Sequence, residues 1–163
     1  MATAPILPLT GEHSARWKIL GAVHTALQAA TELAAIAPAI HRNPVGGVKV
    51  ERDKLAVVLR WDRDRKLGAV AMDERRTFSL MVGCIANTDD ADADADVLSE
   101  AVGAVLRRLM PDLNKLDGVR EVSLAEADIN PLIEDVPIDG ALVVSTLDVS
   151  YRQRARYFVS AST

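Results

Sequence analysis

Hydrophobic residues recur at three- and four-residue steps in two stretches of the chain, which predicts two helices with one apolar side each. The first is expected after Ser14, a suitable N-cap residue, and before Pro38, which lacks the backbone N–H that a helix interior requires. The second is expected from Ala95 to Met110, with Pro111 as its stop. The apolar sides are expected to hold Leu20, Val23, Leu27, Ala30 and Ala34 in the first helix, and Val97, Leu98, Ala101, Val102, Val105, Leu106, Leu109 and Met110 in the second.

The pattern between and after these helices is typical of strands. Residues 40–43 predict a short extended piece, and residues 55–61 are apolar on both faces up to Arg60, as in a strand near the middle of a sheet. Residues 75–86 alternate between apolar and wetter positions, and residues 119–130 and 141–157 predict antiparallel neighbours joined by a turn at residues 137–140. The buried sides are expected to hold Phe78, Leu80, Val82, Cys84, Ala86, Val143, Leu147, Val149 and Tyr151.

Together these elements predict an α+β fold, in which two main helices pack against a mainly antiparallel sheet of four to five strands. The length of 163 residues suits one domain, expected over residues 14–158. A flexible N-terminal arm is expected over residues 1–13, and a C-terminal tail over residues 159–163. Residues 62–66, five charges of alternating sign, are expected in a solvated loop or hairpin rim.

Composition limits the class of protein. Hydrophobic residues make up 49% of the chain, enough for a core that needs neither disulfides nor metals. Cys84 is the only cysteine, which excludes a disulfide within the chain and favours a reducing compartment. No stretch approaches the roughly 18 apolar residues of a membrane span, and residues 1–13 lack the pattern of a leader peptide. A cytoplasmic protein with no membrane partner is expected.

The formal charge of -4 conceals a strong segregation of charge along the chain. Residues 42–76 carry ten basic and six acidic residues, whereas residues 87–148 carry four basic and fifteen acidic ones. Blocks of opposite sign on one small domain suit contacts with another copy or a partner. Separately solvated faces explain the same pattern equally well.

Three arginines, Arg152, Arg154 and Arg156, fall on one side of the last predicted strand. They could contact phosphates, but the chain is acidic overall and contains six aromatic residues, which argues against a specific nucleic-acid partner. A row of arginines also discourages uncontrolled pairing of an edge strand, which is the simpler interpretation.

The aspartates at positions 90, 92 and 94 resemble the first half of a helix-loop-helix calcium loop. The second half fails, because Ala95 and Ala101 stand where that loop needs glycine and glutamate. Acidic capping of the following helix is the favoured role, and a weak, nonspecific cation site stays open.

Other candidates for chemistry are incomplete. Gly46-Gly47 lacks the third glycine and the following Lys-Ser or Lys-Thr of a phosphate loop, and is expected to be a turn. The three histidines are not at metal-ligand spacing, and Cys84 lies on an apolar face, where a thiol is usually a small buried hydrophobe. We therefore expect no catalytic residue, no metal and no cofactor, and we do not expect an enzyme.

The order of the elements resembles a known family. The segments that carry the resemblance are the helix with Leu20, Val23 and Leu27, the segment Ile40-His41-Arg42-Asn43-Pro44, the strand 55–61, the strand that begins Arg75-Arg76-Thr77-Phe78, the helix 95–110 after an Asp/Ala-rich lead-in, and the ending Leu147-Asp148-Val149-Ser150-Tyr151-Arg152. In this order they are similar to the tail terminator, or tail-completion, proteins of long-tailed phages, of the lambda-type minor tail protein U kind. The resemblance covers residues 14–157.

The resemblance implies a structural phage or prophage protein rather than an enzyme. Members of that family close the head-proximal end of the finished tail tube as a hexameric ring and provide the surface to which the filled head docks. The implied partners are further copies of the chain, the tail tube protein and the head–tail connector proteins. The implied location is the host cytoplasm during assembly and then the head–tail junction of the virion.

In such a ring each copy presents two different surfaces to its neighbours. We expect the basic segment 60–76 to meet the acidic segment 89–96 or 126–139 of a neighbour or of the tube protein, with Trp61 as an anchor inside a charged rim. The candidate interface residues are Trp61, Asp62, Arg63, Asp64, Arg65, Lys66, Asp89, Asp90, Asp92, Arg152 and Arg154. Two rival functions stay open: a neck or head-completion joining protein, and a metabolite-binding or regulatory α+β module of the host.

Overall fold

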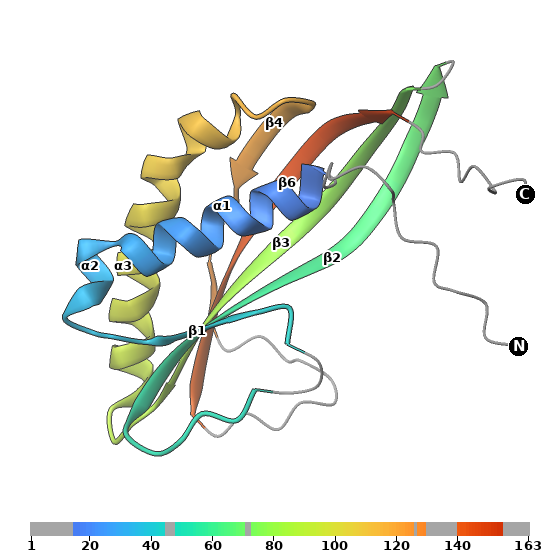
Figure 1. The fold of residues 1–163 in the computed structure, drawn as a ribbon. Helices are drawn as coiled ribbons and strands as arrows, with labels where there is room; N and C mark the ends of the chain where they lie inside the picture. The colour runs from blue at the N-terminus through green and yellow to red at the C-terminus, as the bar shows by residue number, and fades with distance from the viewer. Residues whose placement is uncertain (1–14, 45–47, 71–72, 126, 130–139, 155–163) are drawn as a thin grey trace, which may run out of the picture.

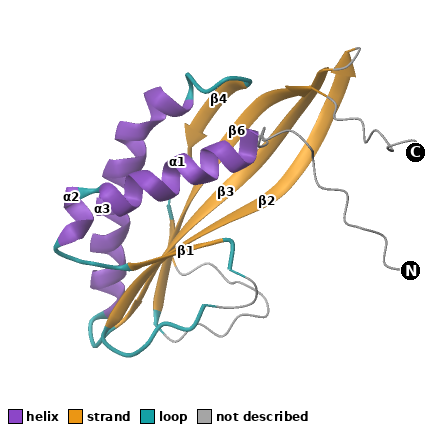
Figure 2. Ribbon diagram, in the orientation of Figure 1, coloured by secondary structure: helices purple, strands orange, loops and turns teal. Residues whose placement is uncertain are grey.

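A mixed β-sheet with helices on one face forms the body of the protein (Figures 1 and 2). The computed structural model describes residues 15–44, 48–70, 73–125, 127–129 and 140–154. The expected N-terminal arm, the turn at Gly46-Gly47, the C-terminal tail and most of the 137–140 turn lie outside these residues. The α+β fold class predicted from the sequence is confirmed.

The strands follow the order β1-β2-β3-β6-β4 across the sheet, and β5 also pairs with β6. Their bounds are β1 Ala39–Arg42, β2 Lys54–Val70, β3 Asp73–Asn87, β4 Val119–Leu124, β5 Asp128–Ile129 and β6 Ala141–Arg154. β1 runs parallel to β2, and the other pairs are antiparallel. The expected antiparallel pairing of the last two strand regions is therefore confirmed. β6 lies between β3 and β4, so Arg152 is not on an edge strand as predicted, and Arg156 lies outside the described residues.

The helices are α1 (Ala15–Ala29), α2 (Thr31–Ala34) and α3 (Ala91–Leu113). The first predicted helix is divided in two because Ala30 adopts an extended conformation, with φ -71° and ψ 123°. α3 begins earlier than predicted and passes through Pro111 instead of ending there. Pro111 lies in the last turn, where its missing N–H costs a single helical hydrogen bond, and the buried Leu113 beyond it keeps that turn packed on the core.

The core lies between the helices and the sheet. Tyr151, Leu20, Leu80, Leu106 and Leu147 are among its fully buried side chains. Burial of each such leucine contributes about 1.5–3 kcal/mol relative to exposure. The alternation predicted for residues 75–86 is confirmed, because Phe78, Leu80, Val82, Cys84 and Ala86 are all buried. The helix predictions erred at Val97 and Ala34, which are exposed, and missed Ile19, which is fully buried.

The opposite side of the sheet, called the open face below, carries no helix among the described residues (Figure 2). Its half nearest the start of β2 is apolar, with Ile85, Leu142 and Val144 packed against Val50 and Val58. Its other half, toward the paired ends of β2 and β3, is polar and contains Asp62, Arg63 and Arg65 of the predicted interface residues of β2. Residues 62–66 thus lie in β2, one arm of the antiparallel β2–β3 pair. Of the two predicted alternatives, the solvated loop is wrong, and the hairpin is nearer to the structure.

Candidate assembly surface

The paired ends of β2 and β3 extend beyond the helix layer (Figure 1). We call residues 62–70 and 73–79 the β2–β3 extension; they are paired from Asp62 and Ser79 to Val70 and Asp73, with register shifts between Asp62 and Arg65 and between Lys66 and Gly68. The β-propensity of the apolar run 55–61 and its pairing with β3 carry the strand through the charged residues, which is why the loop prediction failed. The extension is therefore a strand pair with one face toward the helices and one toward the open side.

A β-bulge decides which charges of β2 point to which face. The register shifts between Asp62 and Arg65, and Arg63 has a φ of 52°. Because a bulge places one extra residue opposite its partner strand, Asp62 and Arg63 both lie on the open face, and Asp64 lies on the helix face. Arg65 then returns to the open face beside Arg63.

Asp64 is the centre of an ionic cluster on the helix face. Its carboxylate accepts hydrogen bonds from Arg16 Nη1 at 2.6 Å and from Arg76 Nε at 3.0 Å. The hydroxyl of Tyr151 donates to the same carboxylate, 3.1 Å from either oxygen. Burial, with a further contribution from Asp64, raises the pKa of Tyr151 to about 12. The cluster joins α1, β2, β3 and β6, so Asp64 serves the interior of the chain.

The same face of the extension carries two more ion pairs that involve Glu74. This carboxylate accepts from Lys66 Nζ at 2.8 Å and from Arg76 Nη1 at 3.0 Å. Both bonds stabilise the ionised form, and the pKa of Glu74 is lowered, chiefly by Lys66 and then by Arg76. The charges on this face are therefore largely neutralised within the chain.

Trp61 also points to the helix side. Its ring lies 6.1 Å from that of Trp17, and the Arg16 guanidinium lies 5.2 Å from its centre. The Arg42 guanidinium in turn covers Trp17 at 4.7 Å. Trp61 is half-buried in this stack, which fastens α1 to β2. Residues 60–66 are therefore divided between the two faces of the sheet. Trp61, Asp64 and Lys66 lie on the helix face, and Arg60, Asp62, Arg63 and Arg65 lie on the open face.

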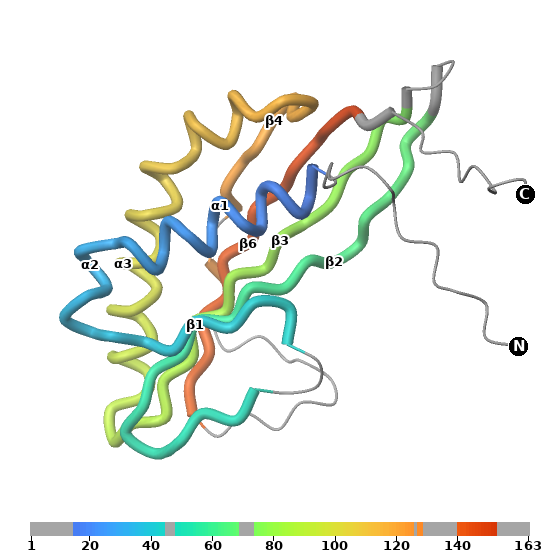
Figure 3. The backbone as a smooth tube through the Cα atoms, in the orientation of Figure 1, coloured from blue at the N-terminus to red at the C-terminus, as the bar shows by residue number. Residues whose placement is uncertain are grey.

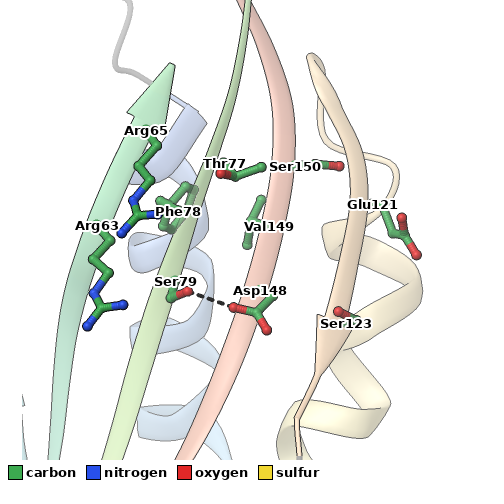
Figure 4. A pocket seen from close by; sticks show the side chains of 10 residues that line it. All are labelled: Arg63, Arg65, Thr77, Phe78, Ser79, Glu121, Ser123, Asp148, Val149 and Ser150. Atoms are coloured by element: carbon green, nitrogen blue, oxygen red, sulfur yellow. Dashed lines mark hydrogen bonds between the residues drawn. The ribbon is translucent and has the colours of Figure 1, made fainter. Parts of the chain in front are cut away.

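The polar half of the open face contains a shallow hollow of about 420 Å³ (Figure 4). Its floor crosses four strands in two transverse rows set by the pairing register. The first row is Arg65, Thr77, Ser150 and Glu121, and the second is Ser79, Asp148 and Ser123, with Arg63 lining the hollow from β2. The Ser79 hydroxyl donates to Asp148 Oδ1 at 2.6 Å. The two walls of the hollow differ in charge, with Arg63 and Arg65 on β2 and Glu121 on β4.

The arginines on the open face of the extension differ from the charged residues on its helix face, which form ion pairs within the chain. Arg65 and Arg75 form no ion pair with any described residue, and both are exposed. Arg63 has a single exposed pair, with Asp62 at 3.2 Å. Arg152 is exposed on β6 opposite Arg75. The structure does not describe the side chain of Arg154, although the residue belongs to β6. The open face of the extension is therefore available to an acidic partner.

The predicted acidic residues lie at the other end of β3. Asp89 and Asp90 are exposed in the turn before α3, and Asp92 is exposed in its first turn. The Asp90 side chain makes no capping hydrogen bond, although the favoured interpretation of this run was helix capping; Asp94 instead accepts from the Thr88 hydroxyl at 2.5 Å. Asp89 makes an exposed pair with Arg52 at 3.4 Å. The structure therefore separates the basic and acidic candidates instead of joining them.

The described residues offer no obvious chemistry. They contain no group of three or more His, Cys, Asp or Glu side chains arranged to hold a metal ion. Cys84 is buried, and burial raises the pKa of its thiol to about 12, which suppresses its reactivity. None of the helices in this part of the chain is long and apolar enough to cross a membrane.

Sequence reasoning missed the β4 and β6 side of the hollow. The alternation of Leu147 and Val149 with Asp148 and Ser150 placed those polar residues on the outer face, but gave no reason to single them out. Glu121 had no such signal. Glu121 and Arg65 lie at the same height along the strands only because of how β2, β3, β6 and β4 pair, and these strands are far apart in the sequence.

Comparison with known proteins adds no relative. No protein-family model matches the chain, and no curated protein matches it.

Proposed function

We propose that the protein is a structural component of a phage or prophage tail, which closes the head-proximal end of the tail tube as a ring, ends tube growth and provides the surface for head docking. The observation that supports this most is the placement of exposed charge of opposite sign at the two ends of one strand. The exposed arginines of the β2–β3 extension and the acidic residues 89–96 lie at the two ends of β3 (Figure 3).

These two charged regions cannot neutralise each other within one copy. Thr77, the register partner of Arg65, and Asp89 are separated by 12 residues along the chain, a span on the order of 40 Å at about 3.3 Å per residue. Interaction between exposed charges at that distance is almost fully screened, since the Debye length is about 8 Å at physiological ionic strength. The two regions therefore act as separate docking surfaces for different partners.

A ring-shaped end cap needs such a polarity. Each copy must contact two neighbours through different lateral surfaces, the tube through one rim and the head through the other. A sheet whose strands run from one rim to the other presents its edges to the neighbours and its ends to the tube and the connector. In this arrangement the paired ends of β2 and β3 and the acidic residues 89–96 lie toward opposite rims, while the side of β2 faces a neighbouring copy.

A neck or head-completion protein is the nearest rival, because it makes the same kinds of contact. The host metabolite-binding module is favoured by one observation, the hollow of about 420 Å³, whose volume falls within the range of small-molecule sites. Eight of its ten lining residues, however, are polar or charged, whereas most such sites are lined by apolar side chains. Ring-forming assembly is the function that uses both charged ends.

The test is tube capping. The tail tube protein encoded in the same gene cluster is polymerised with and without this protein, and tube length is followed by light scattering and electron microscopy. We expect growth to stop and the protein to be found at one end of each tube. Tubes of unchanged length with no bound protein would contradict the proposal, and protein bound to heads alone would favour the neck component.

A further inference from the structure

We propose that neighbouring copies in the ring join through a lateral ion pair between Arg65 of one copy and Glu121 of the next. This inference rests on the proposed function and names the contact that closes the ring. Both residues are exposed, and they stand on the opposite walls of the hollow, on β2 and β4. Figure 4 shows Arg65 and Glu121 on opposite sides of the strands between them.

The two residues lie at the same level of the sheet. Arg65 is the register partner of Thr77, Thr77 that of Ser150, and Ser150 that of Glu121. A rotation about a ring axis that runs along the strands keeps each row at its level. It therefore brings the β4 side of one copy to the β2 side of the next, with Glu121 opposite Arg65.

Both sides are accessible along this stretch of the sheet. β1 covers β2 from Ala56 to Leu59, and no described strand pairs with its outer side beyond that point. β4 has β6 on its inner side and no described strand on its outer side. The sheet thus leaves two lateral surfaces that face away from each other, as a head-to-tail contact requires.

Charge makes the contact specific for opposite sides. The open face of β2 carries Arg63 and Arg65 beside the single acid Asp62, whereas the described residues on the β4 side include Asp117, Glu121 and Asp128 and the one basic residue Arg120. Contact between two β2 sides or between two β4 sides sets like charges against each other. Only contact of β2 with β4 pairs opposite charges, so a ring is favoured over a symmetric dimer.

The contact is made by side chains and not by a continuous sheet. The Asn114 Oδ1 atom, at the C-cap of α3, accepts the hydrogen bond of the Val122 N–H at 2.9 Å. The Asn114 amide in turn donates to the Met110 carbonyl at 2.9 Å. Because this N–H is already bonded, β4 is not free to add a strand along its full length, and Glu121 remains available through its side chain.

The experiment is a charge swap read by sedimentation velocity and native mass spectrometry on the full-length protein. Arg65→Glu and Glu121→Arg are prepared singly, combined in one chain, and mixed as two single variants in equal amounts. Lys49→Glu, an exposed change of equal charge away from both sides, is the control. Thermal unfolding of each variant verifies that the fold is retained.

We expect each single variant to weaken ring formation by about tenfold or more, since like charges then face each other. The double variant and the equal mixture should both restore assembly, because in an alternating ring every contact again pairs opposite charges. Unchanged assembly of the single variants would overturn this contact while leaving the ring proposal standing. Loss of ring assembly in the single variants that neither the double variant nor the mixture restores would also overturn the Arg65–Glu121 contact. A wild-type protein that never forms rings would overturn the proposed function itself.

Discussion

The hydroxyl of Tyr151 on β6 donates to the carboxylate of Asp64 at the bulge of β2, across the intervening strand β3, at 3.1 Å. Two arginines complete the cluster, Arg16 from α1 and Arg76 from β3. Asp64 is thus the point where the helix layer, the body of the sheet and the β2–β3 extension are joined. The extension can present its open-face arginines in a fixed direction because this cluster holds its other face.

Loss of the Asp64 charge should loosen that joint. Asp64→Asn leaves two arginines without their shared carboxylate, and we expect the free energy of unfolding to fall by about 2 kcal/mol. Asp62→Asn, two residues away but exposed on the open face, is the matched control and should change it by less than about 0.5 kcal/mol. Urea denaturation measures both, and equal losses would contradict the central role of Asp64.

The Tyr151 hydroxyl should make stability depend on alkaline pH. Its pKa in the folded state is raised from 10 to about 12, chiefly by burial and further by Asp64. Between pH 10 and 12 the unfolded chain loses this proton and the folded chain keeps it, so stability falls as pH rises through that window. Tyr151→Phe removes the titrating group.

Tyr151→Phe should be less stable than the wild type by about 1 kcal/mol at pH 8, because the buried hydrogen bond is lost. The difference should narrow as pH rises from 10 to 12, since the wild type alone carries this titration. Unfolding by urea at a series of pH values gives both quantities. A difference that stays constant over the window would show that Tyr151 does not titrate as described.

A glycine beside the start of β6 should tolerate no side chain. Gly140 has a φ of 123°, and a Cβ atom built there would lie 2.1 Å from the Ala86 carbonyl oxygen. Gly140→Ala should therefore lower the free energy of unfolding by at least about 2 kcal/mol. Gly21→Ala is the contrasting control, because its Cβ meets nothing within 4 Å in α1 and should stabilise the helix by about 0.5–1 kcal/mol.

Assembly should depend on salt through the open-face arginines. Raising ionic strength screens contacts between exposed charges, so wild-type rings should weaken steeply between about 0.05 and 0.5 M salt. Arg63→Glu/Arg65→Glu should weaken assembly at low salt and flatten this dependence. Lys66 is left unchanged because it pairs with Glu74 within the chain. Light scattering over a salt series records the effect, and an unaltered slope in the double variant would count against these arginines.

Much of the fold was predictable because its signals are local. The alternation of Phe78, Leu80 and Val82 identified the buried side of β3 without knowledge of the neighbouring strands. The apolar positions of both helices were mostly right for the same reason. Their limits were less predictable: Ala30 breaks the first helix although alanine favours helices, and Pro111 lies inside the second.

The site was less predictable because it depends on pairing between distant segments. The sequence shows residues 62–66 as one charged run, and nothing local indicates the bulge that sends Asp64 to the helix face and Arg63 to the open face. Trp61, expected to anchor a partner, stacks with Trp17. Glu121 and Arg65 lie at the same height along the strands because of the register of four strands, and no local sequence pattern encodes that register.

Closure of identical copies into a ring is the property on which the proposed function depends. Its most direct test is the mass of the purified full-length protein by native mass spectrometry over a wide concentration range, together with electron micrographs of the same samples. We predict a species of six copies that appears as a six-fold ring and grows with concentration. A strict monomer at every concentration and on tail tubes, or a symmetric dimer as the largest species, would contradict the account.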